Sequence, residues 1–323
     1  MGWKIVAVLA AAGLAAMTTA AVADDAATAE QIVAVMNKLW GQHAGVRANH
    51  AKGVVLEGAF TPSPAGKTLS KAALFSAASI PVIVRFSDST GVPTLPDGDP
   101  NANPHGMAVK FRLASGDDVD IVANSLPFFP VATGEEFRDL FQAFVDSPPG
   151  SAKPTKAEQF FAAHPAAGAA FGGVHTPSSF AREVYNGVDT FVFVGSGGAK
   201  TPFRFRIAPE GGPDYLSAAD AAKLPPNGLV DEIRTRVSGH AVKFTLQAQL
   251  AAPGDAIDDA TKPYPAERRI VDLGTISVTK AIAEDKELNF LPLNLVDGLE
   301  PSKDPLIQVR NDAYAISYGR RLQ

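Results

Sequence analysis

Two neighbouring segments, GMAVKFRL at residues 106–113 and DVDIVA at residues 118–123, decide the fold class of this 323-residue chain. In the first segment, the residues from Val109 to Leu113 alternate between apolar and charged side chains. This period of two is typical of a strand that buries one face and leaves the other in polar surroundings. Because only a short connection separates the two segments, they predict consecutive antiparallel strands.

Six other short segments, rich in β-branched and aromatic residues, predict further strands. They are GVVLEGAF (53–60), PVIVRFS (81–87), DTFVFV (189–194), PFRFRIA (202–208), HAVKFTLQAQL (240–250) and IVDLGTISV (270–278). Eight half-buried strands, mostly in consecutive pairs, favour an antiparallel β-barrel. Helices are predicted at about 135–146, 155–171 and 217–237, and a last helix begins near Asp304-Pro305, an N-cap followed by proline. The predicted class is therefore α+β, an eight-stranded antiparallel β-barrel with surrounding helices.

The composition excludes several classes of protein. A formal charge of −5 leaves no general basic field for nucleic acid, and 46% hydrophobic residues are too many for a disordered chain. The chain has no cysteine, which removes thiol nucleophiles, zinc ribbons and Cys-ligated iron. Any metal chemistry must therefore use His, Asp, Glu or Tyr.

The first 23 residues have the pattern of a secretory signal peptide. Lys4 supplies the positive charge, residues 5–17 form an apolar run too short to span a bilayer, and residues 21–23 (AVA) form a small-residue cleavage site. We therefore expect an exported protein, periplasmic in a bacterium, with no membrane span after removal of the signal. Thr28 to Gln31 next resembles a capping box, which predicts a first helix ending near Trp40.

Familiar catalytic motifs are missing, since the chain contains no G-x-x-x-x-G-K-[ST], G-x-S-x-G or H-E-x-x-H, and the glycines at 195–198 fit a hairpin turn. Four clusters of polar and aromatic residues remain as candidates for chemistry. They are RANHAKG (47–53), VRFS (84–87) with NPHGMAVKF (103–111), DIVANSLPFF (120–129), and RNDAY (310–314) followed by Arg321.

In these clusters the sequence resembles the haem catalase family, in particular its small exported members, the catalase-related peroxidases. The resemblance runs from Arg47 to Arg321 with all clusters in family order. His-Ala-Lys-Gly, Arg-Phe-Ser, Gly-x-Ala-Val-Lys-Phe, Asn-x-x-Pro and Arg-x-x-x-Tyr carry it. It implies that residues 24–323 form a single catalase-like domain that binds haem b, with the proximal tyrosine on the C-terminal helix.

On the distal side of the haem, the resemblance implies that His50 moves the proton of the peroxide and that Asn124 orients the peroxide. Ser87 would hydrogen-bond the His50 ring and fix its tautomer, and Phe129 would keep the pocket apolar. A neutral imidazole can take a proton from bound peroxide and return it to the departing oxygen, which is the chemistry that O–O cleavage needs.

On the proximal side, the resemblance implies that Tyr314 binds the iron as a phenolate with Arg310 beside it, and that Arg47, Arg85 and Arg321 bind the haem propionates. The spacing of Arg310 and Tyr314 agrees, because residues four apart on a helix share one face and an adjacent cation favours a phenolate. Tyr318 is an alternative ligand. Its partner one turn earlier is Tyr314 rather than a cation.

The function expected from these residues is a haem peroxidase that reduces hydrogen peroxide or organic hydroperoxides with a small-molecule or protein electron donor. From the resemblance we also expect a short member of the family without the C-terminal region of large catalases, and a more open site of this kind would favour peroxidase activity. A compact true catalase remains an alternative, and so does a periplasmic barrel that binds haem or an apolar ligand without turnover. The donor and the oligomeric state are left open by the sequence.

Overall fold

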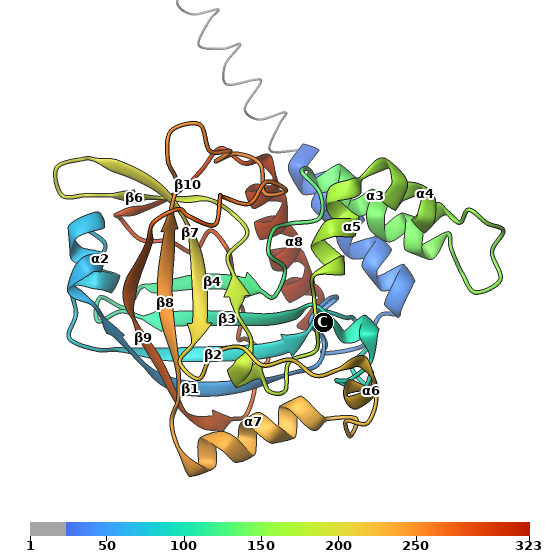
Figure 1. Cartoon of the computed structure of the whole chain (residues 1–323), viewed down its shortest axis with the longest axis horizontal. Helices are drawn as coiled ribbons and strands as arrows, with labels where there is room; N and C mark the ends of the chain where they lie inside the picture. The colour runs from blue at the N-terminus through green and yellow to red at the C-terminus, as the bar shows by residue number, and fades with distance from the viewer. Residues whose placement is uncertain (1–23) are drawn as a thin grey trace, which may run out of the picture.

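A closed antiparallel barrel forms the centre of the computed structural model, which describes residues 24–323 (Figure 1). Its strands are β1 (Gly53–Pro62), β2 (Ile80–Asp88), β3 (His105–Arg112), β4 (Asp118–Asn124), β5 (Tyr185–Asn186), β7 (Lys200–Pro209), β8 (Val242–Leu250) and β9 (Ile270–Ile282). The sheet runs β7-β5-β4-β3-β2-β1-β9-β8, and β8 pairs with β7 to close the ring. The predicted eight-stranded antiparallel barrel is therefore confirmed.

One predicted strand lies elsewhere. The segment predicted at 189–194 forms β6 (Phe191–Val194), which pairs with β7 and with β10 (Leu299–Pro301) as an extension of the sheet. The two-residue strand β5 takes the eighth place in the ring, between β4 and β7. Two residues are too few to show an alternating pattern, so this strand gave no sequence signal. The glycines at 195–198 form the turn between β6 and β7, as predicted.

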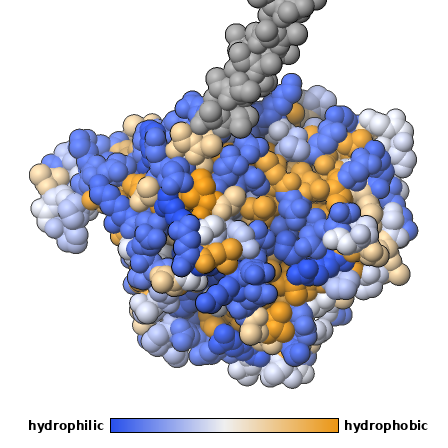
Figure 2. Space-filling view, turned by 180° about the vertical axis from the view of Figure 1, so that it is seen from behind, coloured by the Kyte–Doolittle hydropathy of each residue, from blue (hydrophilic) through white to orange (hydrophobic). Residues whose placement is uncertain are grey.

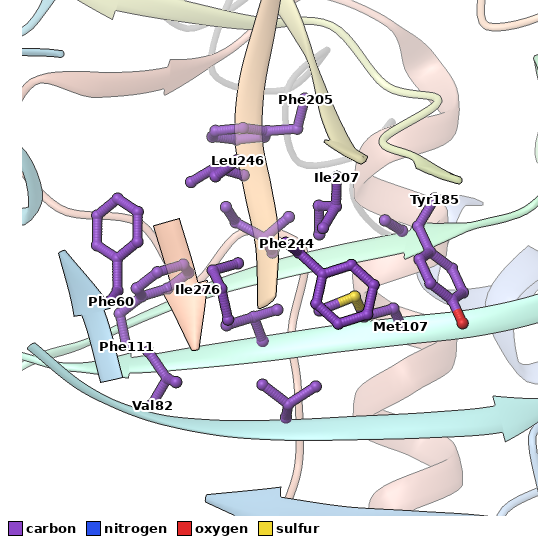
Figure 3. Packing of buried hydrophobic residues seen from close by; sticks show 14 of the residues in the cluster. Phe60, Val82, Met107, Phe111, Tyr185, Phe205, Ile207, Phe244, Leu246 and Ile276 are labelled. Carbon is purple, nitrogen blue, oxygen red and sulfur yellow. The ribbon is translucent and has the colours of Figure 1, made fainter. Parts of the chain in front are cut away.

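The barrel interior is packed with large apolar side chains, several of them fully buried (Figure 3). On β3, Met107, Val109 and Phe111 point into this core, which explains the alternation in the sequence. The outer face of β3 and β4 is covered as well. There Lys110 pairs with Asp120 at 2.7 Å, and Asp120 also accepts a hydrogen bond of 2.9 Å from the backbone N–H of Leu291. The buried charges are therefore paired and hydrogen-bonded.

Helices surround the barrel. They are α2 (Pro64–Leu69), α3 (Gly134–Val145), α4 (Lys156–Ala163), α5 (Pro165–Gly172), α6 (Ala218–Ala221), α7 (Gly228–Gly239) and α8 (Pro305–Arg321), with 3-10 turns at Ala73–Phe75, Pro100–Ala102 and Phe180–Arg182. The predicted helix 155–171 is two helices, because proline begins a new one at 165, and the predicted helix 217–237 is interrupted around Pro225-Pro226. The last helix begins as predicted, with the Asp304 side chain accepting from the Leu306 N–H at 2.9 Å.

The N-terminal helical residues 24–40 pack beside α3 and α8, so that α8 lies between the barrel and a helical layer (Figure 1). Ile32 and Met36 meet Phe141 and Val309 in this layer. The predicted helix start at Thr28 is wrong, because residues 24–27 are already helical and the Thr28 hydroxyl bonds to Glu135 at 3.0 Å. The predicted signal peptide lies outside the described residues.

The outside of the molecule is mostly hydrophilic on the face shown in Figure 2, with apolar side chains gathered in patches between polar ones. Within residues 24–323, no helix combines the length and the apolar character that crossing a bilayer requires.

Candidate functional site

A cavity of about 690 Å³ lies between one end of the barrel, α8, α3 and the N-terminal helical residues. This volume is in the range of small-molecule and cofactor sites. All nine residues selected from the sequence line this cavity: Arg47, His50, Arg85, Ser87, Asn124, Phe129, Arg310, Tyr314 and Arg321. The structure therefore brings together residues that are spread over most of the chain.

The strand register explains how the barrel end assembles one side of the cavity. Ser87 pairs with Gly53 on β1 and with Gly106 on β3, and Gly106 pairs in turn with Asn124 on β4. These residues form one row across four adjacent strands. His50 lies three residues before Gly53 and therefore reaches the same row.

The His50 ring is held against this row. Its Nδ1 lies 3.0 Å from the Ser87 hydroxyl, so a hydrogen bond fixes the ring orientation and leaves Nε2 for other partners. Gly106 provides the space, because a Cβ there would lie 2.9 Å from both His50 Cε1 and Ser87 Oγ. The His50 backbone has φ of 57°, in the left-handed region, and its N–H donates to the Asn49 side chain at 2.8 Å.

The electrostatic surroundings keep His50 neutral. Burial, and next the positive charges of Arg85 and Arg47, lower the pKa of His50 to about 3. An uncharged imidazole is the form that can accept a proton. Asn124 is fixed by its own loop, because its Oδ1 accepts from the Leu126 N–H at 2.9 Å. Its amide NH₂ is then the end available as a donor.

One face of α8 also lines the cavity, and it presents Arg310, Tyr314 and Arg321. The Arg310 guanidinium is buried and forms an ion pair with Asp189, in the segment before β6. Burial lowers the pKa of Arg310, but the charges of Asp189 and Tyr314 outweigh it and raise that pKa. Arg310 also lies over the Phe129 ring, 5.1 Å from its centroid. Sequence reasoning missed Asp189, which belongs to no motif.

Tyr318 lines the same cavity one turn after Tyr314. The Arg321 guanidinium lies 5.2 Å from the centroid of the Tyr318 ring. Ser317, which lies between the two tyrosines on the helix, accepts a hydrogen bond of 3.1 Å from the Ala48 N–H. This bond ties α8 to the segment before His50. The two tyrosines therefore differ in their cationic neighbours, Arg310 for Tyr314 and Arg321 for Tyr318.

The three predicted propionate-binding arginines converge at one edge of the cavity, and we call Arg47, Arg85 and Arg321 the arginine cradle. One carboxylate, Glu284, lies among them and bridges Arg47 and Arg85. Burial and the charge of Arg47 lower the pKa of Arg85 to about 10, against the opposing charge of Glu284. The same causes lower the pKa of Arg321 to about 10. Sequence reasoning also missed Glu284.

A second group of buried charges lies directly behind the row of site residues. Lys52 pairs with Asp97 and lies 3.3 Å from Asp88, and the His105 ring lies 3.5 Å from Asp88. Asp97 also accepts the N–H groups of Leu229 and Val230 at the start of α7. His105, interpreted from the sequence as structural, is thus enclosed in an ionic cluster, and burial lowers its pKa to about 4.

The comparisons with known proteins agree with the fold. The family model described as Catalase matches residues 21–323. The chain therefore belongs to the catalase family.

Within this family the chain is similar over its length to small relatives. It is 31% identical to a catalase-related peroxidase of Synechococcus elongatus, over 99% of this chain and 96% of that protein. It is also 31% identical to a catalase-related peroxidase of Mycolicibacterium paratuberculosis, over 91% of this chain and 95% of that protein.

Larger relatives share only part of their length with it. A catalase of Pseudomonas syringae pv. syringae is 30% identical over 85% of this chain but only 57% of its own length. Among solved structures, a bacterial catalase has a TM-score of 0.77 at 22% identity, over 87% of this chain and 58% of that one. Catalase A from Saccharomyces cerevisiae has a TM-score of 0.76 at 19% identity, over 62% of its chain. These structures support the fold, and this chain spans about three fifths of their length.

Proposed function

We propose that this protein is a haem-dependent peroxidase that reduces hydrogen peroxide or organic hydroperoxides with an electron donor. The observation that carries the proposal is the arrangement of one cavity. A neutral His50, held by Ser87, shares this cavity with Arg310 and Tyr314 of α8 and with the arginine cradle.

The residues fit haem b. The cradle has three guanidinium groups and one carboxylate, so its net charge is +2, which complements the two propionates of the cofactor. In addition, Arg321 Nε is buried without a hydrogen-bond partner among the described residues, which leaves a donor for an anion. We infer that Arg47, Arg85 and Arg321 hold the propionates and that Tyr314 provides the iron ligand, with Arg310 at its side. When bound, haem would supply the iron that binds the peroxide, and the haem would provide the electrons that reduce it.

The chain's own residues then do three things. His50 accepts the proton of the peroxide at its free ring nitrogen and returns it to the leaving oxygen. Ser87 keeps Nδ1 hydrogen-bonded and so fixes the direction of the ring. When Nδ1–H donates to the Ser87 hydroxyl, Nε2 is the nitrogen that accepts the proton. Asn124 donates a hydrogen bond from its amide and orients the peroxide.

The wall of the cavity supports organic hydroperoxides as substrates. A chain of aromatic rings runs from Phe129 through α3 to α4 and α5, with neighbouring ring centroids 4.9 to 6.3 Å apart. Its members are Phe129, Phe137, Phe141, Phe144, Phe161 and Phe171, and all of them line the cavity. An apolar substituent on a peroxide would bury its surface against these rings.

The second candidate function is a compact true catalase, favoured by the 30% identity to the Pseudomonas protein of that name.

Residues 1–23 have the composition of a signal peptide, and we propose that the protein is exported, to the periplasm in a bacterium.

The decisive experiment is to load the purified protein with haem b and to follow oxygen release and donor oxidation in the same samples. Donor oxidation without oxygen release supports the peroxidase, and release of oxygen as the main product supports the catalase. If neither occurs while haem remains bound, the protein is a binding protein. His50→Gln, assayed in parallel, shows whether the turnover depends on the proposed proton carrier.

A further inference from the structure

A carboxylate from a segment to which the sequence analysis assigned no role lies inside the arginine cradle. We propose that Glu284 is a resident counter-anion of the cradle, which holds Arg47 and Arg85 together before the cofactor binds and limits the charge of the cradle to +2. The inference rests on the proposed function as far as the cofactor is concerned. The part that concerns the protein alone can be tested without it.

The contacts show how the segment organises the cradle. Glu284 Oε1 accepts from Arg47 Nη1, and both carboxylate oxygens lie 3.1 Å from Arg85 Nε. Four residues later, the Leu288 carbonyl accepts from Arg47 at 2.9 Å and from Arg321 at 2.7 Å. One short segment after β9 therefore contacts all three arginines.

The location distinguishes this group from an ordinary surface ion pair. The side chains of Arg47 and Arg85 are 16% and 4% exposed, and that of Glu284 is 30% exposed. In the pair Lys280–Glu57, on the adjacent strands β9 and β1, the exposures are 69% and 44%. Solvent screens that surface pair, whereas charges in the cradle interact at lower effective dielectric.

The charges of the group indicate what Glu284 contributes. Burial raises the pKa of the Glu284 carboxyl, but the charges of Arg85 and Arg47 outweigh this and lower it, so the group is ionised. Without that carboxylate, three like charges would share one buried edge of the cavity. Repulsion between them would open the cradle or draw in an anion from solution.

The same charge has a consequence for the cofactor. A cradle of +2 attracts a dianionic tetrapyrrole, and removal of Glu284 raises the cradle to +3. The attraction for a dianion should then increase, whereas a tetrapyrrole with esterified carboxylates should gain nothing. Glu284 thus lowers the affinity for the dianion while it stabilises the empty site.

The first measurement is the thermal stability of the cofactor-free protein. We expect Glu284→Gln to lower the Tm by about 3 °C or more, and sodium sulfate to recover this loss by placing an anion among the arginines. Glu287→Gln is the matched control and should change little, because Glu287 lies on the same segment but, among the described residues, forms no ion pair with the arginines of the cradle, whereas Glu284 pairs with two of them. If Glu284→Gln is as stable as the control and responds no more strongly to sulfate, the proposal is wrong.

The second measurement is a titration with haem and with haem dimethyl ester, followed by absorption. The ratio of the ester Kd to the haem Kd should be about three- to tenfold larger in Glu284→Gln than in the wild type, since one charge of the cradle is no longer compensated. An unchanged or smaller ratio overturns the proposal.

A double variant keeps the proposal testable if Glu284→Gln does not fold. Glu284→Gln with Arg321→Gln returns the cradle to +2, so we expect it to fold and to lose the sulfate response. A double variant that remains unfolded would show that charge is not what Glu284 supplies. Failure of the proposed function is separate, because a wild type that binds no haem would leave the thermal comparison intact.

Discussion

Peroxide turnover should be nearly independent of pH down to about pH 4, because His50 stays neutral there. Burial, Arg85 and Arg47 lower the pKa of His50 to about 3. A lowered pKa favours the neutral form, so a reaction that needs this form persists as the pH falls and is lost only near pH 3. At pH 4.5 an ordinary histidine would be only about 1% neutral, whereas a histidine with a pKa near 3 would be about 97% neutral. The two cases differ about a hundredfold in the fraction of active base.

The assay must separate this effect from acid unfolding. Because the pKa values of His50 and His105 are both lowered in the folded protein, the unfolded chain binds protons that the folded one does not. The free energy of unfolding therefore decreases as the pH falls below about 6.5, the ordinary histidine value. We would hold the haem-loaded enzyme at pH 7.5, mix it rapidly into buffers from pH 7.5 to 4, and measure initial peroxide consumption while haem absorption reports integrity.

The control is Ser87→Ala, which frees the ring of His50 without adding charge. We expect its rate to be lower at every pH, with the same flat profile. The reasoning would be refuted by a wild-type rate that falls tenfold per pH unit below 6.5 while the haem spectrum stays constant. Such a profile would mean that His50 titrates as in solution, or that another histidine carries the proton.

Three further changes test the other parts of the site. His50→Ala should retain haem and lose about 10²–10⁴-fold in peroxide consumption, and a near-wild-type rate would reject its role as proton carrier. Gly106→Ala should reduce the rate about ten- to a hundredfold, because the new Cβ would lie 2.9 Å from the His50 ring and overpacking costs about 1–3 kcal/mol. The control is Gly168→Ala, where a Cβ meets nothing within 4 Å, and its rate should equal that of the wild type. Tyr314→Phe should abolish the phenolate features of the haem spectrum and Tyr318→Phe should not, and the reverse result would show that the ligand is Tyr318.

The parts of the fold that the sequence predicted are those with a local periodic signal. On β3, Met107, Val109 and Phe111 point into the core, and from Val109 onward the alternation of these apolar residues with charged ones is visible in the sequence. β5 has two residues and joins β4 to β7 within the ring through the pairing of Asn186 with Asn124 and Arg206. Its position follows from tertiary pairing, which leaves no periodicity to detect. The interruptions of the predicted helices 155–171 and 217–237 were also missed. Their alanine-rich stretches favour helix on both sides of Pro165 and Pro225, so each pair of helices was predicted as one.

The candidate site shows the same division. The nine residues selected through the ordered motifs line one cavity. Strand register brings Ser87 and Asn124 together, and α8 adds Arg310, Tyr314 and Arg321. Asp189 and Glu284 were missed, although each pairs with a selected arginine. Both are single acids in segments without a motif, and their partners are more than a hundred residues away in the chain. Charge pairs of this kind are determined by the folded structure.

Buried polar contacts also fix the position of α8, the helix that carries Tyr314. The barrel end carries His50 and Ser87, whereas Tyr314 is on α8. Arg310 ties this helix to Asp189, and Arg321 ties its end to the Leu288 carbonyl. Asp189 compensates the charge of Arg310 in an ion pair. The electric field that Arg310 exerts on Tyr314 is therefore that of an oriented ion pair rather than that of an isolated cation. The position of Tyr314 and the electrostatics of this iron-ligand candidate therefore depend on the same buried polar contacts.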